Sequence, residues 1–336
     1  MTRRPILSAI VLLVFGLSTA AVLAAGLQPY KKDPGAFAVA VVRYDWLDTA
    51  RNRPVPVKIY YPEQGAGPFP VIVFSHGLGG SREGYEYLGR HWASHGYVVA
   101  HVQHQGSDDK VWKDQERPFR EMQRAIGDTR NAIARPLDVR FVLDQLTILA
   151  RQPGPVQNRL NLKAAGIAGH SFGGWTTLAV AGEVFPGGTE SDPRFKAAIA
   201  MSAAVDLRHD PDKSYGTIRI PILHMTGTRD DSPIGETRAG QRRIPFDHIQ
   251  GADQYLVTLE GGDHMVFAGQ RRGGRVDEKD PLFHDLILES TTAFWDAYLK
   301  DDAAAKSWLA GGGFQDVMGK NGKLEIRSAA RGTTKG

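Results

Sequence analysis

A pentapeptide at residues 169–173 constrains the fold of this chain more than any other feature. It reads Gly-His-Ser-Phe-Gly and matches the pattern G-x-S-x-G. An apolar stretch at 165–168 precedes it, and a stretch with helical character at 173–183 follows it. A serine between a buried strand and a helix sits on a sharp turn that lifts its hydroxyl above the sheet edge, and glycines let strand and helix pack closely. The pattern therefore predicts a nucleophile elbow at Ser171.

The flanking sequence predicts the sheet that such a turn requires. Two β-branched stretches, 38–46 and 55–61, are separated by turn residues and predict an opening antiparallel hairpin. Apolar strands then alternate with helices, which indicates an α/β fold with a mostly parallel sheet and helices on both faces. Strands are expected at 70–74, 97–100, 165–168, 197–201, 220–225 and 255–259, and helices at 85–94, 120–150, 173–183 and 281–299. We expect the second of these helices to be broken or capped around Pro136.

Two later segments offer partners for the serine. His264 follows the last expected strand and precedes the long C-terminal helix, where a general base belongs. Asp230 lies in a glycine-containing turn after another strand, where a carboxylate can orient a histidine. Asp231 is its direct rival, which the sequence alone does not separate from it, and Asp206 is a more remote candidate. The order serine, acid, histidine is that of the α/β-hydrolase fold.

A glycine-rich loop completes the predicted constellation. Residues 76–80 read His-Gly-Leu-Gly-Gly and come directly after the strand at 70–74. In this architecture that loop and the residue after the nucleophile each supply a backbone amide to an oxyanion hole. We expect the amides of Leu78 and Phe172 in this role, with Gly77 as the alternative to Leu78. His76 is expected to brace the loop.

Composition excludes several classes of chemistry. The chain has no cysteine, which excludes disulfides, thiolate catalysis and a lipid anchor on a cysteine. The net charge is +4 and opposite charges are interspersed, so no nucleic-acid partner is expected. Nucleotide-binding and H-E-x-x-H motifs are absent, and His101 and His104 have no evident third ligand, so neither a cofactor nor a metal is expected.

The first 25 residues read as a signal peptide. Arg3 and Arg4 form a basic start, residues 6–17 are apolar, and small residues follow up to Ala25. This apolar run is short for a membrane span of about 20 residues, so we expect cleavage, no stable span afterwards, and a periplasmic or secreted protein. Whether export follows the general or the twin-arginine route is left open, as is the oligomeric state.

The mature chain is expected to form one domain and a tail. Residues 26–318 contain all the predicted strands, helices and motifs and form the α/β-hydrolase domain. Residues 319–336 are rich in glycine and lysine and predict a flexible tail.

The motifs together resemble a known family. Over about residues 41–295 the chain is similar to bacterial α/β-hydrolases known as predicted dienelactone hydrolases, which are related to platelet-activating-factor acetylhydrolases and cutinase-like polyester hydrolases. The resemblance rests on residues 76–80, 169–174, 227–233 and 262–265. It implies a serine hydrolase that acts on carboxylic esters, of the carboxylesterase or lipase-like class. Dienelactone hydrolases proper use a cysteine nucleophile, which this chain lacks. An amidase or peptidase on the same fold and a non-catalytic secreted binding protein are the alternatives.

Overall fold

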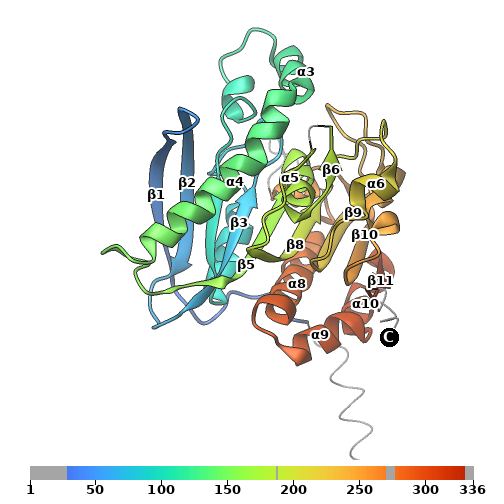
Figure 1. Ribbon diagram of the computed structural model, residues 1–336. Coiled ribbons are helices and arrows are strands. Elements are labelled where there is room, and N and C mark those ends of the chain that lie inside the picture. Colours follow the sequence, from blue (N-terminus) through green and yellow to red (C-terminus); the bar gives the residue numbers. More distant parts are fainter. Residues whose placement is uncertain (1–28, 187, 270–276, 330–336) are drawn as a thin grey trace, which may run out of the picture.

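The computed structural model describes residues 29–186, 188–269 and 277–329. The predicted signal peptide, residues 1–25, lies outside them. Nine strands form one sheet in the order β1-β2-β4-β3-β5-β8-β9-β10-β11 (Figure 1). The strands from β4 to β10 run parallel in this order, and helices connect most of them. The predicted α/β-hydrolase architecture is confirmed.

The elements have the following bounds. The strands are β1 (Val39–Asp48), β2 (Arg53–Pro62), β3 (Phe69–Ser75), β4 (Val98–Val102), β5 (Leu160–His170), β6 (Val184–Phe185), β7 (Gly188–Thr189), β8 (Phe195–Met201), β9 (Ile222–Arg229), β10 (Gln254–Asp263) and β11 (Gly322–Arg327). The α-helices are α2 (Glu86–Ser94), α3 (Pro118–Gly127), α4 (Thr129–Leu149), α5 (Phe172–Ala181), α6 (Pro211–Tyr215), α7 (Ile244–His248), α8 (Asp280–Leu299), α9 (Ala303–Ala310) and α10 (Gly313–Met318).

Two apolar cores sandwich the sheet. On one face, residues of α2 and α8 such as Trp92 and Trp295 pack with the sheet and with α9 and α10. On the other face, α4 and α5 supply residues such as Val142 and Leu178. Figure 1 shows α4 crossing in front of the central strands, with α3 above its upper end. Because both faces are covered, all seven residues of β3 are buried, as expected for a strand with a continuous apolar run.

The parallel direction of the central strands brings four loops to one edge of the sheet. The carboxyl ends of β3, β5, β9 and β10 lead into the glycine-rich loop, the serine turn, the acidic turn and the histidine loop. Carboxyl ends of parallel strands share one edge, which is where ligands bind in open α/β sheets. The topology therefore gathers predicted site residues that lie up to 188 positions apart in the chain, from His76 to His264.

Two predictions about elements are wrong. Pro136 lies inside α4 without ending it. The break comes earlier, at Asp128, whose side chain accepts a hydrogen bond from the Arg130 amide and caps α4. The flexible tail was predicted to begin at residue 319, but residues 322–327 form β11 and pair antiparallel with β10. Leu324 packs against the apolar core from this strand. The sequence did not predict this edge strand because the surrounding residues are mostly polar.

Within the described ranges, no helix combines the length and the apolar character that crossing a membrane requires.

Candidate active site

Ser171 occupies a strained turn between β5 and α5. Its backbone has φ 59° and ψ −116°, a conformation that residues with a side chain rarely adopt. A Cβ on Gly173 would lie 1.9 Å from the Ser75 carbonyl oxygen, and one on Gly169 would lie 2.2 Å from the Gly173 carbonyl oxygen. Only glycine fits at both positions. The two glycines of the pentapeptide thus permit the close packing that holds Ser171 at the sheet edge.

Ser171, His264 and Asp230 form a continuous hydrogen-bonded chain, which we call the pocket array. Ser171 Oγ lies 2.9 Å from His264 Nε2, and His264 Nδ1 lies 2.7 Å from Asp230 Oδ1. Asp230 is fully buried and His264 nearly so, whereas Ser171 is partly exposed. A carboxylate on Nδ1 fixes the tautomer that leaves Nε2 free to accept the serine proton. The structure thus brings together three residues that are far apart in sequence.

The Asp230 carboxylate is held in its ionised form by a dense set of donors. Its Oδ2 accepts hydrogen bonds from Ser202 Oγ at 2.5 Å and Thr226 Oγ1 at 2.8 Å. Arg242 Nε lies 3.3 Å from Oδ1 and is itself almost fully buried. Burial alone would raise the pKa of Asp230, but the hydrogen bond from His264 and the charge of Arg242 outweigh it and lower that pKa. Asp230 can therefore stabilise a positive charge on the imidazole.

The rival acids have other partners. Asp231 points to the surface, where it accepts from the Ala239 amide at 3.0 Å and pairs with Arg238 at 3.1 Å. Asp206 pairs with Arg208 at 2.6 Å. The geometry therefore favours Asp230 over both, a distinction that two adjacent aspartates in a turn could not provide from sequence.

The glycine-rich loop leaves one suitable amide free. The Gly77 amide donates to Tyr85 Oη at 3.2 Å, and the Gly79 amide donates to the Ser107 carbonyl at 2.9 Å. Among the described residues, the amides of Leu78 and Phe172 have no protein acceptor. Both residues line the same pocket as Ser171. Leu78 is thus better suited than Gly77 to supply an oxyanion donor.

His170, the residue directly before the serine, has a role that the sequence did not reveal. Its Nδ1 bonds Tyr85 Oη at 2.8 Å and its Nε2 bonds the His264 carbonyl oxygen at 2.9 Å. Burial, followed by the neighbouring His264, lowers the pKa of His170 well below its usual value, so its ring is neutral. Because Tyr85 also accepts from Gly77, a single chain of hydrogen bonds joins the glycine-rich loop to the backbone of His264.

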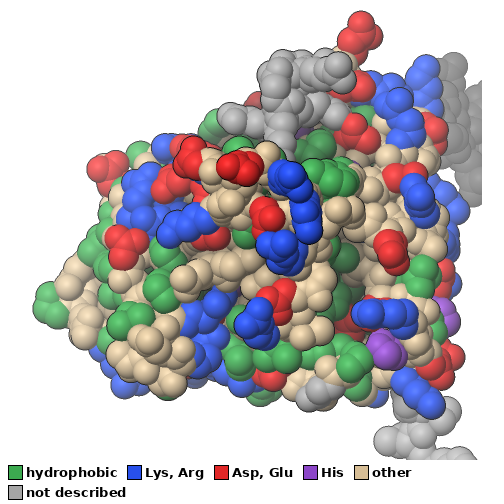
Figure 2. All heavy atoms as spheres, turned by 90° about the horizontal axis from the view of Figure 1, so that it is seen from above, with side chains coloured by type: hydrophobic (Ala, Val, Ile, Leu, Met, Phe, Trp, Pro, Cys, Tyr) green, Lys and Arg blue, Asp and Glu red, His purple; other side chains and the backbone are tan. Residues whose placement is uncertain are grey.

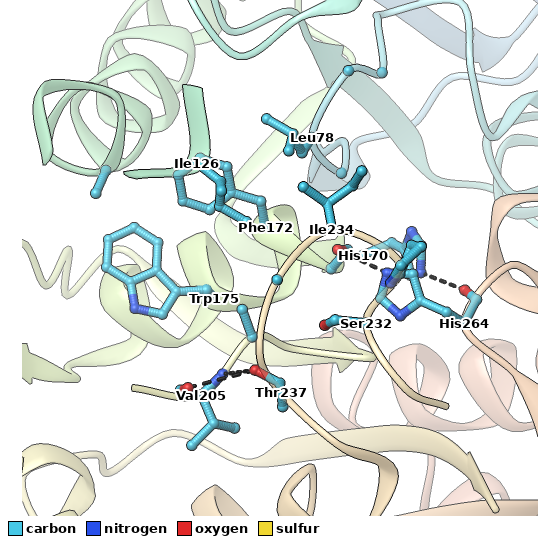
Figure 3. Close-up of a pocket in the computed structure, with 18 of the residues that line it drawn as sticks. Leu78, Ile126, His170, Phe172, Trp175, Val205, Ser232, Ile234, Thr237 and His264 are labelled. Carbon is cyan, nitrogen blue, oxygen red and sulfur yellow. Dashed lines mark hydrogen bonds between the residues drawn. The ribbon is translucent and has the colours of Figure 1, made fainter. Parts of the chain in front are cut away.

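Ser171 and His264 of the pocket array line a pocket of about 1330 Å³. Figure 3 shows Ile126, Phe172 and Trp175 on one side of it and His170 and His264 on the other. The rings of Phe172 and Trp175 lie 5.7 Å apart, and Phe185 packs edge-on against Trp175 at 5.4 Å. Apolar side chains with a few polar groups are typical of small-molecule sites. The side chains of Phe172 and Trp175 on α5 and of Phe185 on β6 make this side of the pocket suitable for a hydrocarbon group.

The surface charges and the partners of His101 and His104 bear on the expectations about nucleic acid and metal. On the face seen in Figure 2, basic and acidic side chains are interspersed. His101 bonds the Gly84 carbonyl oxygen and His104 bonds Asp138, so the two rings have separate partners. Within the described part of the chain, no group of three or more potential metal ligands is found.

The chain is similar in sequence to known hydrolases. The family model "Platelet-activating factor acetylhydrolase, isoform II" matches residues 40–125, and the model "Serine hydrolase (FSH1)" matches residues 95–239. The chain is 28% identical over 307 residues to a platelet-activating factor acetylhydrolase of Cavia porcellus, covering 76% of this chain and 63% of that protein. It is 26% identical to the Bos taurus protein of the same name, covering 59% of this chain and 48% of that one.

A bacterial relative has a different name. Cutinase est2 of Thermobifida alba is 29% identical over 210 residues, covering 62% of this chain and 56% of the cutinase. The chain thus spans about half to two-thirds of the length of these relatives. The resemblance to platelet-activating-factor acetylhydrolases and cutinases that the motifs indicated is confirmed.

Proposed function

We propose that this protein is a serine-dependent carboxylic ester hydrolase that works through a covalent acyl-enzyme. The observation that carries the proposal is the pocket array, in which Ser171 Oγ lies 2.9 Å from His264 Nε2 at the wall of a large pocket with an aromatic side. The similarity to enzymes named acetylhydrolase, serine hydrolase and cutinase supports the same reaction class.

The first half of the reaction forms the acyl-enzyme. Ser171 Oγ attacks the ester carbonyl carbon while His264 Nε2 takes the hydroxyl proton. The carbonyl oxygen becomes an oxyanion, which the amides of Leu78 and Phe172 stabilise. Asp230 stabilises the imidazolium. The tetrahedral intermediate then collapses, the bond to the alcohol oxygen breaks, and His264 gives its proton to the leaving alcohol.

The second half repeats these steps with water. His264 removes a proton from a water molecule, whose oxygen attacks the acyl carbonyl of the acyl-enzyme. The second oxyanion occupies the same pair of amides. Collapse releases the carboxylic acid and returns the proton to Ser171. Protein groups alone supply every proton transfer and every charge-stabilising contact in this scheme.

The pocket supports an ester with an apolar acyl group as the substrate. Phe172, Trp175 and Phe185 follow Ser171 along one wall and contact one another. We propose that this wall receives the acyl chain.

We also propose that the protein is exported to the periplasm or beyond the cell, because residues 1–25 have the features of a cleaved signal peptide.

Hydrolysis of p-nitrophenyl esters with increasing acyl length tests the proposal. We expect turnover by the mature protein and a loss on the order of 10⁴–10⁶ in kcat for Ser171→Ala, since the nucleophile is removed. Equal activity of the two proteins would contradict the proposal. If only p-nitroanilide amides are cleaved, the protein is an amidase. If a folded wild type cleaves neither, a non-catalytic binding protein is the better account.

A further inference from the structure

A second serine–histidine–aspartate chain lies behind the pocket, and we call it the buried array. Ser75 Oγ lies 2.9 Å from His104 Nε2, and His104 Nδ1 lies 3.0 Å from Asp138 Oδ2. All three residues have no solvent exposure, and none of them lines the pocket. The buried array therefore has the bonding pattern of the pocket array but no access to a substrate.

The hydrogen bonds of the buried array have fixed directions. Burial, followed by the charge of Arg135, lowers the pKa of His104 well below its usual value, so the ring is neutral. Its Nδ1–H then donates to Asp138, and its Nε2 accepts from the Ser75 hydroxyl. Asp138 is also paired with Arg53 at 2.8 Å and Arg51 at 2.9 Å. The array thus anchors Ser75, the last residue of β3, to α4.

Arg135 connects this array to the loop that carries Leu78 and to α5, which begins with Phe172. Its Nη2 donates to Ser75 Oγ at 3.0 Å and to the carbonyl oxygen of His76, two residues before Leu78. Its Nε donates to Thr176 Oγ1 at 2.9 Å on α5. Its guanidinium carbon lies 4.5 Å from the ring centroid of Phe172, the residue that carries the other amide. One fully buried guanidinium therefore contacts the loop backbone at His76 and, on α5, the side chains of Phe172 and Thr176.

Further hydrogen bonds hold the loop on the C-terminal side of Leu78. Arg135 Nη1 donates to Ser107 Oγ at 2.8 Å, and the Ser107 carbonyl accepts from the Gly79 amide at 2.9 Å. The His104 amide donates to His76 Nε2 at 3.1 Å. The backbone on both sides of Leu78 is thus fixed by groups that Arg135 or the buried array touches.

We propose that Arg135 is a positioning residue for the oxyanion hole, and that the buried array holds its guanidinium in place. The proposal rests on the proposed esterase function and names a residue that the sequence did not single out. Two amides stabilise an oxyanion only when both are 2.7–3.1 Å from the position the charge will occupy, so their relative placement controls the rate. Arg135 sets that placement by joining the His76 carbonyl to α5.

The test uses Arg135→Lys and Ser75→Ala, with Ser290→Ala as a matched control. Ser290 is likewise fully buried and donates to the Leu286 carbonyl oxygen at 2.7 Å, on α8 and outside the pocket. For each folded protein we would measure kcat and KM for a p-nitrophenyl ester and Ki for an alkyl trifluoromethyl ketone. This ketone adds to the nucleophilic serine and places an oxyanion in the hole, whereas KM reports mainly ground-state contacts.

For Arg135→Lys we expect kcat to fall about 10- to 100-fold and Ki to rise by a similar factor, with KM within about twofold of the wild type. Ser75→Ala should change kcat and Ki in the same direction by less than about tenfold. Ser290→Ala should match the wild type. If Arg135→Lys does not fold, Thr176→Val, which removes the Nε acceptor, takes its place with the same expectation.

Two results would overturn the proposal. One is an unchanged ratio of Ki to KM in folded variants at Arg135 or Thr176, which would mean that Arg135 only stabilises the fold. The other is an unchanged kcat in the folded variants at both Arg135 and Thr176. If the wild type itself neither hydrolyses the ester nor binds the ketone, the proposed function fails first, and that outcome is visible before any variant is made.

Discussion

The pocket array and the buried array contain the same three residue types with nearly the same spacing. The serine–histidine distance is 2.9 Å in both, and the histidine–aspartate distances are 2.7 Å and 3.0 Å. Their backbones differ. Ser171 sits at positive φ on a strained turn at the pocket wall, whereas Ser75 ends a strand whose every residue is buried. The comparison teaches that a hydrogen-bonded serine, histidine and aspartate do not make an active site unless a substrate can reach the serine and unpaired backbone amides lie nearby.

The charges around the two serines also differ. Arg135 donates directly to Ser75 Oγ and occupies a lone pair that nucleophilic attack would need. In the pocket array the cation, Arg242, lies away from the serine, 3.3 Å from Asp230 Oδ1 and 3.2 Å from His264 Nδ1. A cation on the acid favours the ionised carboxylate, while a cation on the serine ties up its oxygen. The two arrays therefore suit different tasks, catalysis in one and anchoring in the other.

Removing the histidine from each array should separate these tasks most strongly. We expect His264→Ala to lower kcat on the order of 10⁴–10⁶, because the general base is lost. His104→Ala should keep kcat per folded molecule within about tenfold of the wild type but lower the free energy of unfolding by about 2–4 kcal/mol, through a cavity and unpaired polar groups. Ester hydrolysis and urea unfolding measure the two effects. A His104→Ala protein that is stable but inactive would reverse the assignment.

Substituting the two adjacent aspartates should give the next largest contrast. Asp230→Asn should lower kcat about 10³- to 10⁴-fold, because the neutral amide no longer fixes the imidazole tautomer or stabilises its charge. Asp231→Asn is the matched control, and its kcat should stay within about twofold, since its carboxylate is exposed. The same ester assay measures both proteins. Similar losses in both variants would contradict the choice of Asp230.

The smallest expected effect is the pH dependence of stability introduced by two buried histidines near Arg135, His104 of the buried array and His76. The pKa values of His76 and His104 lie well below 6.5, because burial and the charge of Arg135 disfavour their charged forms. The unfolded chain takes up protons below about pH 6.5 while these rings stay neutral in the fold, so stability is lost as pH falls. Each ring contributes up to about 1.4 kcal/mol per pH unit.

Urea unfolding between about pH 7.5 and pH 5 measures this slope. His104→Gln removes one of the buried rings that take up a proton only on unfolding and should reduce the slope by up to about 1.4 kcal/mol per pH unit over the lower part of the range. An unchanged slope in His104→Gln would show that this ring is not held neutral by the fold.

The sequence was sufficient for the elements that carry strong local patterns. The elbow glycines, the buried strands and the long helix at α8 each have periodicity or turn chemistry that local physics dictates. Because parallel strands deliver their carboxyl ends to one edge, the gathering of Ser171, His264 and an acid from the turn at 230–231 also followed from chain order.

The remaining features depend on tertiary contacts that no local pattern encodes. Asp230 and Asp231 differ only in which side chain the turn directs inward. Arg135, Asp138 and Arg242 are charged residues, which are seldom fully buried unless paired, so they were not expected beside the core. The tail strand β11 depends on a free edge of β10. A histidine in the x position of G-x-S-x-G, next to a serine, was the one available signal for the role of His170.

Labelling with a fluorophosphonate probe, followed by identification of the modified peptide, tests the central claim most directly. The wild type should carry the probe on Ser171 alone, His264→Ala should label far more slowly, and Ser171→Ala should stay unlabelled with Ser75 intact. Labelling of Ser75, or undiminished labelling of Ser171→Ala, would contradict the assignment of the pocket array as the catalytic one.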